Sequence, residues 1–143
     1  MEPLDDTLAT LVASRRTGAL ATIKRDGRPQ LSVVGYAWAP QESLVRVSTT
    51  ADRAKVANLR RDPRASLLVT SQSGWSYAVL EGRVELSPVA AEPGDPTVEA
   101  LVDLFREIQG EHEDWDDYRR AMVADRRLVV RLTVERGYGL HQG

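Results

Sequence analysis

The pattern of apolar and polar positions predicts a chain built mainly from antiparallel strands. Asp26-Gly27 separates the first two strand-like runs, and this dipeptide is a strong local signal for a hairpin. Gly82, inside the long fifth run, predicts a bulge or a barrel bend. Because strands do not alternate with long helices, we expect a closed or nearly closed antiparallel barrel. The six predicted strands are Ala19–Lys24, Gln30–Trp38, Ser43–Thr49, Ala65–Thr70, Trp75–Leu86 and Arg127–Glu135.

Apolar residues at helical spacing predict a few short helices between these strands. The first helix is expected to end at Gly18, and the second begins at an Asp52 cap and runs through Leu59. The third begins with Asp95 as cap and Pro96 at the first helical position, and a short fourth one lies around Trp115–Ala124. The first helix starts at Asp5 or Asp6, with apolar residues Leu4, Leu8, Leu11 and Val12. The predicted core face of the third helix is Val98, Leu101, Val102, Phe105 and Ile108.

Length, charge and residue usage narrow the class of protein. A chain of 143 residues, 42% of them hydrophobic, is expected to form one domain over residues 1–143. A net charge of -2 argues against a general nucleic-acid binder. The absence of cysteine excludes disulfides and thiolate chemistry and fits a reducing compartment. No apolar segment is long enough to span a bilayer and Met1–Asp6 lacks the features of a signal peptide, so we expect a cytoplasmic protein without membrane contact.

The segment Ser48–Asn58 is the strongest local candidate for a binding site. It combines a strand end, a hydroxyl-rich turn and a helix start that carries Arg53 and Lys55. Backbone N–H groups at a helix start, hydroxyls and nearby cations together favour a phosphate. The alternative is that the polar residues only cap the helix while both basic side chains are solvated. Cations at a helix start oppose the helix dipole, however, which favours a bound anion.

Other chemistries find little support in the sequence. The acidic segment Glu111–Asp117 lacks the spacing of known metal-binding motifs and is expected to cap a helix, so no metal site is predicted. Two histidines, without a suitable triad pattern, do not support a hydrolase, and no Gly-rich nucleotide motif is present. Basic pairs such as Arg126-Arg127 are interpreted as solvated. Trp75 and Tyr77 are expected on one face of a strand. There they pack either in the core, against a ring-shaped ligand or against a dimer partner.

Several segments, taken in order, resemble the pyridoxamine phosphate oxidase-like superfamily. They are Leu20–Ile23, Asp26–Ser32, Arg53–Lys55 and Asn58–Ala65. The resemblance is closer to the actinobacterial branch that binds the deazaflavin coenzyme F420, and it covers the chain from about Leu8 to Gly139. The segments that resemble this branch are Gly74–Val79 with Glu81-Gly82, and Asp114–Arg119 with Asp125–Arg127.

The resemblance implies an α+β fold, a six-stranded antiparallel split β-barrel with short flanking helices. It implies a homodimer with two cofactor sites in the grooves between subunits. It further implies an oxidoreductase that transfers a hydride from reduced F420 to a small electron-poor organic acceptor. Such a protein positions the cofactor and excludes water, so no catalytic side chain is assigned. Two alternatives stay open, namely an FMN-binding oxidoreductase of the same fold and a non-catalytic F420-binding carrier or sensor.

The resemblance also implies roles for particular residues. Gln30 and Ser32 would line the strand that binds the cofactor ring, although Val33 replaces a polar residue common in the family. Trp75 and Tyr77 would approach from the partner subunit. The residues expected at the ribityl-phosphate region and the start of the acidic tail are Ser48, Thr49, Arg53, Lys55 and Asn58.

Overall fold

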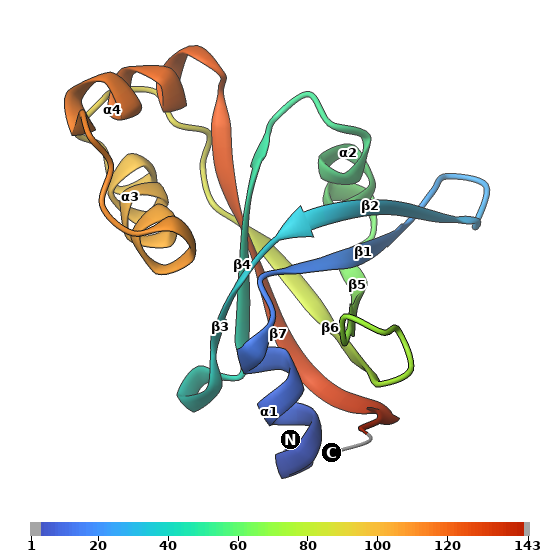
Figure 1. The fold of residues 1–143 in the computed structure, drawn as a ribbon. Helices are drawn as coiled ribbons and strands as arrows, with labels where there is room; N and C mark the ends of the chain where they lie inside the picture. Colours follow the sequence, from blue (N-terminus) through green and yellow to red (C-terminus); the bar gives the residue numbers. More distant parts are fainter. Residues whose placement is uncertain (1–3, 142–143) are drawn as a thin grey trace.

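The computed structural model describes residues 4–141 and shows an antiparallel sheet that curls into a half-barrel, with helices packed against it (Figure 1). The strands follow the order β2-β1-β5-β6-β7-β4-β3 across the sheet. The strands are β1 Thr17–Ile23, β2 Pro29–Gly35, β3 Ala37–Ala39, β4 Leu44–Thr50, β5 Arg64–Thr70, β6 Tyr77–Leu86 and β7 Arg127–Leu140. The helices are α1 Asp6–Ser14, α2 Ala54–Arg61, α3 Pro96–Gln109 and α4 Trp115–Ala124, with a 3-10 turn, η1, at Pro40–Glu42. The predicted α+β fold with an antiparallel split β-barrel is therefore confirmed, apart from the number of strands.

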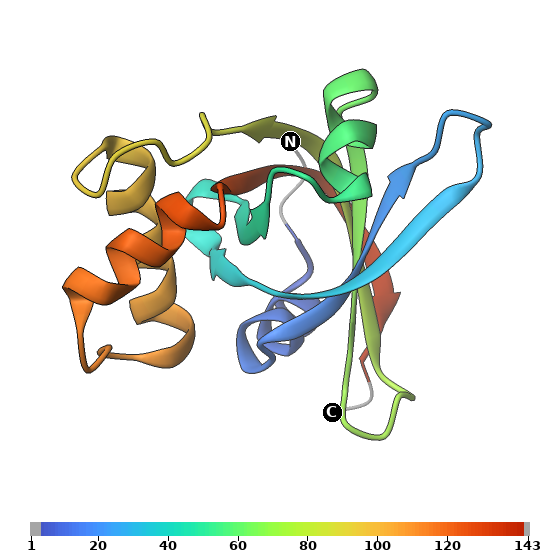
Figure 2. The ribbon, with the colours of Figure 1, turned by 90° about the horizontal axis from the view of Figure 1, so that it is seen from above.

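The prediction of six strands was wrong, because the second predicted strand divides at Tyr36. The amide of Tyr36 donates to the Arg16 carbonyl at 2.9 Å, and its hydroxyl donates to the Val12 carbonyl at 2.6 Å. Before this point β2 pairs with β1, and after it β3 pairs with β4. Since β2 and β3 lie at opposite ends of the strand order, the chain crosses from one edge of the sheet to the other, as the curled sheet in Figure 2 shows.

The long strands β6 and β7 meet at the bulge that the sequence predicted. The register shifts between Glu81 and Gly82, and a Cβ atom at Gly82 would lie 1.9 Å from the Thr133 carbonyl oxygen. Only glycine allows the two backbones to approach so closely. The predicted ends of both strands were wrong. β6 begins at Tyr77, two residues late, and β7 continues past Glu135 to pair with the whole of β6.

Side-chain caps fix the starts of three helices. Asp5 caps α1, Asp95 caps α3 by accepting from the Val98 amide at 2.8 Å, and Asp114 caps α4. These caps agree with the predicted helix starts. The predicted end of α1 was wrong, because the helix ends at Ser14 and Gly18 lies within β1.

Two apolar clusters hold the elements together. The larger one joins α1 and α2 to the strands, and the smaller one joins α3, α4 and β7. Most of the predicted core face of α3 is buried, but Phe105 and Ile108 are only half-buried and Leu104 is buried instead. None of the helices within residues 4–141 is long and apolar enough to cross a membrane.

Candidate functional site

The start of α2 lacks the side-chain cap that the other α-helices have. Arg53 occupies the cap position and makes no side-chain cap bond, so the prediction that Asp52 caps this helix was wrong. The Asp52 carboxylate instead accepts a hydrogen bond of 2.7 Å from the Thr50 hydroxyl, and this bond lowers the pKa of Asp52. The first N–H groups of α2 are therefore left without a side-chain acceptor at the cap.

Two cations flank this uncapped helix start. Arg53 is exposed and Lys55 is half-buried, and neither forms an ion pair within the described chain. Burial lowers the pKa of Lys55, and the charge of Arg53 lowers it further. Two unpaired cations at the positive end of a helix repel each other and the helix dipole, so an anion bound here would relieve both. The donor set fits a phosphate group.

A buried chain of hydrogen bonds ties this helix to the first hairpin. Asn58 on α2 is 7% exposed and donates through Nδ2 to the Thr22 hydroxyl at 3.1 Å. Thr22 on β1 donates in turn to Gln30 Oε1 on β2 at 3.1 Å. Arg61 donates to Asn58 Oδ1 at 3.1 Å and to the Ile23 carbonyl at 3.0 Å. The structure thus brings the predicted residues Gln30 and Asn58 together.

The sequence did not identify Thr22 and Arg61 as site residues, although both lie in segments that carried the family resemblance. Thr22 occupies an inward-facing strand position, where an apolar residue would be usual, and it is 1% exposed. A polar residue at such a position is the signal that could have identified it, because a buried hydroxyl requires a partner.

The predicted ligands Ser32, Ser48 and Thr49 are less closely grouped than Gln30 and Asn58. Ser32 lies on the same face of β2 as Gln30, and its buried hydroxyl has no hydrogen-bond partner among residues 4–141. Ser48 and Thr49 are consecutive on β4 and so face opposite sides of the sheet. Arg127 on β7, interpreted from sequence as solvated, donates from Nη1 to the Ser48 hydroxyl at 3.2 Å. A buried hydroxyl without a partner requires an explanation, and a bound ligand would supply one.

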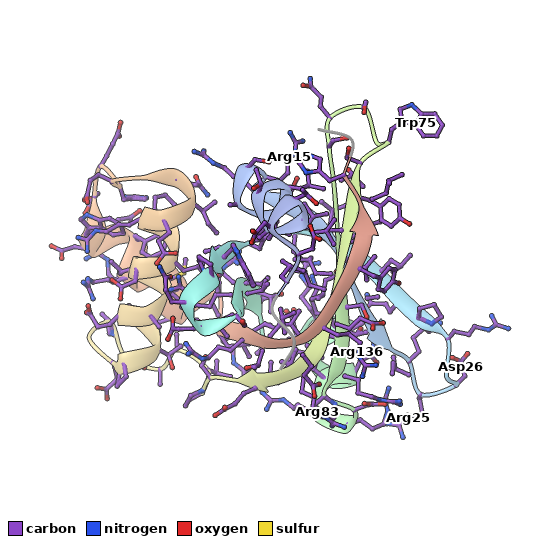
Figure 3. The ribbon with its side chains drawn as sticks, turned by 90° about the horizontal axis from the view of Figure 1, so that it is seen from below. Arg15, Arg25, Asp26, Trp75, Arg83 and Arg136 are labelled. Atoms are coloured by element: carbon purple, nitrogen blue, oxygen red, sulfur yellow. The ribbon has the colours of Figure 1, made fainter. Side chains whose placement is uncertain are left out.

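Trp75 and Tyr77 lie away from these residues within one chain. β5 begins at Arg64, close after α2, and ends at Thr70, which pairs with Tyr77. Trp75 is 76% exposed in the turn before β6, not on the strand face where it was predicted. Figure 3 shows Trp75 projecting at the end of the sheet away from Asp26 in the first hairpin.

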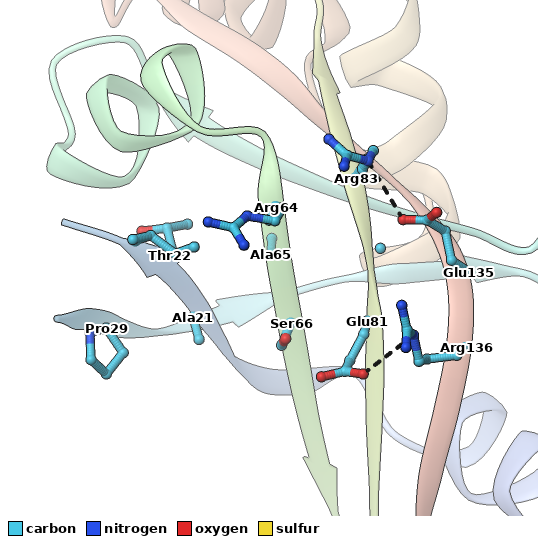
Figure 4. A pocket seen from close by; sticks show the side chains of 12 residues that line it. Ala21, Thr22, Pro29, Arg64, Ala65, Ser66, Glu81, Arg83, Glu135 and Arg136 are labelled. Atoms are coloured by element: carbon cyan, nitrogen blue, oxygen red, sulfur yellow. Dashed lines mark ion pairs between the residues drawn. The ribbon is translucent and has the colours of Figure 1, made fainter. Parts of the chain in front are cut away.

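The cavity on the outer side of the sheet near the first hairpin, about 480 Å³ in volume, is a weaker candidate (Figure 4). Arg83 lies 3.9 Å from Glu135, and Arg136 lies 3.6 Å from Glu81. Arg64, which also lines the cavity, pairs with a neighbouring aspartate at 2.8 Å. The cations that line this cavity thus already form ion pairs with carboxylates, whereas Arg53 and Lys55 do not.

The acidic segment before α4 serves as a cap. Asp114 Oδ1 accepts from the Asp117 amide at 3.1 Å, and His112 Nδ1 accepts from the Asp114 amide at 2.9 Å. Residues 4–141 contain no cluster of three or more His, Asp or Glu side chains arranged to hold a metal ion.

Comparison with known proteins places this geometry in context. The family model described as pyridoxamine 5'-phosphate oxidase matches residues 4–141. An F420H2-dependent biliverdin reductase from Mycobacterium tuberculosis (strain CDC 1551 / Oshkosh) is 29% identical over 136 residues, which are 94% of this chain and 86% of that protein.

Solved structures show the same fold. One described as an F420 reductase superposes with a TM-score of 0.73 at 23% identity, covering 94% of this chain and 98% of the other. A conserved hypothetical protein from Mycobacterium tuberculosis also superposes with a TM-score of 0.73, at 28% identity, covering 96% of this chain and 85% of the other.

Proposed function

Because the chain belongs to the pyridoxamine 5'-phosphate oxidase family, we propose that it is an oxidoreductase that uses coenzyme F420 to reduce a small electron-poor organic acceptor. The observation that carries this proposal is the uncapped start of α2, with the unpaired cations Arg53 and Lys55 beside it. Similarity to an F420H2-dependent reductase supports the deazaflavin over FMN.

Each element of the site has a role in this proposal. Arg53, Lys55 and the first amides of α2 bind the cofactor phosphate, with Asn58 close behind them. Thr22 fixes the Gln30 amide through the buried hydrogen-bond chain, and Gln30 and Ser32 face the ring. When bound, the reduced deazaflavin supplies a hydride, so the acceptor gains two electrons and one proton from it and a second proton from water. The protein contributes position and exclusion of water, and no side chain is assigned as acid or base.

Ser48, Thr49, Trp75 and Tyr77 complete the proposed cofactor site. Ser48 meets the ribityl-phosphate region with its side chain, and Thr49, whose side chain faces the other side of β4, meets it through its backbone. In their own chain Trp75 and Tyr77 lie at the end of β5 that is remote from α2, too far to contact the cofactor bound there. They would instead contact the cofactor of the partner subunit.

A cofactor titration tests the binding proposal. The purified chain should quench or shift F420 fluorescence, and Arg53→Ala/Lys55→Ala should weaken binding by about 2–4 kcal/mol, because charge-assisted contacts to phosphate are lost. Arg16→Ala/Arg120→Ala, two exposed cations outside the site, removes the same charge and should keep the wild-type affinity. Unchanged affinity in the first variant would place the phosphate elsewhere. Tighter binding of FMN than of F420 would favour the FMN alternative.

A turnover assay tests whether the bound cofactor reacts. Loss of reduced F420 absorbance is measured with biliverdin and with a panel of enones, quinones and nitro compounds. Faster oxidation by at least one acceptor than in protein-free solution is the expected result. A chain that binds reduced F420 but leaves it unoxidised with every acceptor would be a carrier or sensor.

We also propose a homodimer, formed through the outer face of the sheet. Monomers rarely expose many large apolar side chains together, and Val33, for example, is 80% exposed. A second copy of this face would cover them and bring Trp75 to the partner's cofactor site. The exposed apolar residues are Leu31, Val33, Leu68, Trp75, Tyr77, Tyr138 and Leu140.

Light scattering after size exclusion tests the dimer. The wild type should elute with twice the chain mass of 15.8 kDa, and Val33→Asp should shift it to the monomer by burying a charge in the interface. Gln41→Asp, an exposed change in η1, should stay dimeric. A wild-type monomer at micromolar concentration would contradict the proposal.

We further propose that residues 1–143 act as one domain in the cytoplasm. β7 contributes to each apolar cluster, which supports a single folding unit, and the lack of cysteine fits a reducing compartment. Fractionation of producing cells should recover the chain with the cytosolic proteins, and recovery in a secreted fraction would contradict this location.

A further inference from the structure

A second pocket, of about 330 Å³, lies between α3, α4 and the sheet. Its wall is mostly apolar and includes the half-buried side chains of Phe105 and Ile108 and the ring of Tyr118. The Tyr118 hydroxyl donates to the Leu101 carbonyl at 3.0 Å, so the polar end of this side chain is already satisfied. The pocket therefore offers an apolar surface to a ligand and falls in the size range of small-molecule sites.

Arg127 is the only charged residue among the described residues that line this pocket, and its guanidinium is not fully hydrogen-bonded. Nη1 donates to Ser48, whereas Nε is buried and makes no hydrogen bond within the described chain. The exposed Asp125 carboxylate forms a long ion pair with Nε, at 4.0 Å, which is beyond hydrogen-bond distance. Nη2 makes no hydrogen bond to a described residue either, and a ligand carboxylate that takes the place of Asp125 would accept from both Nε and Nη2, whose spacing matches its two oxygens. A buried donor without a partner requires an explanation, and a ligand carboxylate supplies one.

We infer that this pocket binds the electron acceptor, a largely apolar conjugated molecule whose carboxylate replaces Asp125 at the Nε and Nη2 edge of Arg127. The acceptor role rests on the proposed function, and the pocket meets the cofactor residues at Ser48, which it shares with them. The conjugated part lies against Phe105 and Ile108. During the reaction the acceptor gains a hydride from reduced F420 and a proton from water, and its carboxylate is unchanged.

A matched pair of probes separates the carboxylate from the rest of the acceptor. They are 3-(1,4-naphthoquinon-2-yl)propanoate and its methyl ester, which share one quinone and differ in charge. The wild type should show a KM for the acid at least tenfold below that for the ester, with similar kcat. Equal KM values for the two probes would overturn the inference, whatever any variant does.

Variants then locate the carboxylate contact. Arg127→Met keeps an apolar stem and should raise the KM for the acid at least tenfold while leaving the KM for the ester within twofold. Arg127→Lys keeps the positive charge but loses the paired N–H donors of the guanidinium, and it should give an intermediate KM for the acid. Arg131→Met, on the same face of β7 but outside the pocket, should behave like the wild type. An equal effect of Arg127→Met on both probes, or a loss of F420 affinity in its fluorescence titration, would place Arg127 in the cofactor site and overturn the inference.

Binding measured without turnover distinguishes this inference from the proposed function. Calorimetry of the cofactor-free chain should detect the acid, and Arg127→Met should abolish that heat. If this holds but reduced F420 is never oxidised, the proposed reductase activity fails while the carboxylate site stands. If reduced F420 is oxidised by acid and ester alike, the reductase stands and the carboxylate site fails.

Discussion

Replacement of Thr22 by valine tests whether the buried hydrogen-bond chain holds α2 against the first hairpin. The hydroxyl makes two hydrogen bonds of 3.1 Å, one from Asn58 and one to Gln30. At about 1 kcal/mol for each bond, the variant should lose about 2 kcal/mol of unfolding free energy. For a chain of this size that corresponds to a fall of roughly 6 °C in Tm. The affinity for F420 should fall severalfold as well, because the Gln30 amide loses its orientation.

Differential scanning calorimetry of Thr22→Val beside Thr70→Val measures this effect. Thr70 is half-buried on β5, and its side chain makes no hydrogen bond within the described residues, so its replacement should change stability by less than about 0.5 kcal/mol. Melting temperatures of the two variants within a degree of each other would refute the reasoning, since the hydroxyl of Thr22 would then contribute nothing beyond its volume.

Three further predictions concern the bulge and two titrating groups. Gly82→Ala should cost about 3 kcal/mol in chemical denaturation, because its Cβ atom would lie 1.9 Å from a β7 carbonyl, whereas Gly94→Ala meets no atom within 4 Å and should be nearly neutral. Burial lowers the pKa of Lys55, so F420 affinity should fall as pH rises through that lowered value, and Lys55→Arg should remove the fall. A hydrogen bond from Arg64 lowers the pKa of Asp62 to about 2, and NMR titration of Arg64→Ala should return it toward 3.8.

Local chemistry made much of the fold predictable. The hairpin at Asp26-Gly27, the cap at Asp95 and the bulge at Gly82 each depend on one or two residues whose conformational preferences are strong. Errors arose where a distant contact decided the outcome. Gly18 was interpreted as a helix stop, but it is needed in β1, because a Cβ atom there would lie 2.7 Å from the carbonyl oxygen of Leu68. No pattern near Gly18 in the sequence contains that information.

The candidate site was predictable in part for the same reason. Arg53 and Lys55 stand out locally, because cations are unexpected at a helix start. The prediction that Asp52 caps this helix failed because Thr50, two residues earlier, already binds the carboxylate. Arg127 has the sequence neighbourhood of a solvated arginine, and only its position on β7, opposite β4, brings it to Ser48.

The position of β7 has a consequence for how the chain folds during synthesis. β7 is made after the other six described strands, yet it lies between β6 and β4 in the sheet. Until it leaves the ribosome, β4 and β6 each present an unpaired edge, and neither can complete its ladder. Both strand edges of the nascent chain therefore stay open until β7 pairs with them, and this is the stage at which chaperones would protect the chain from aggregation.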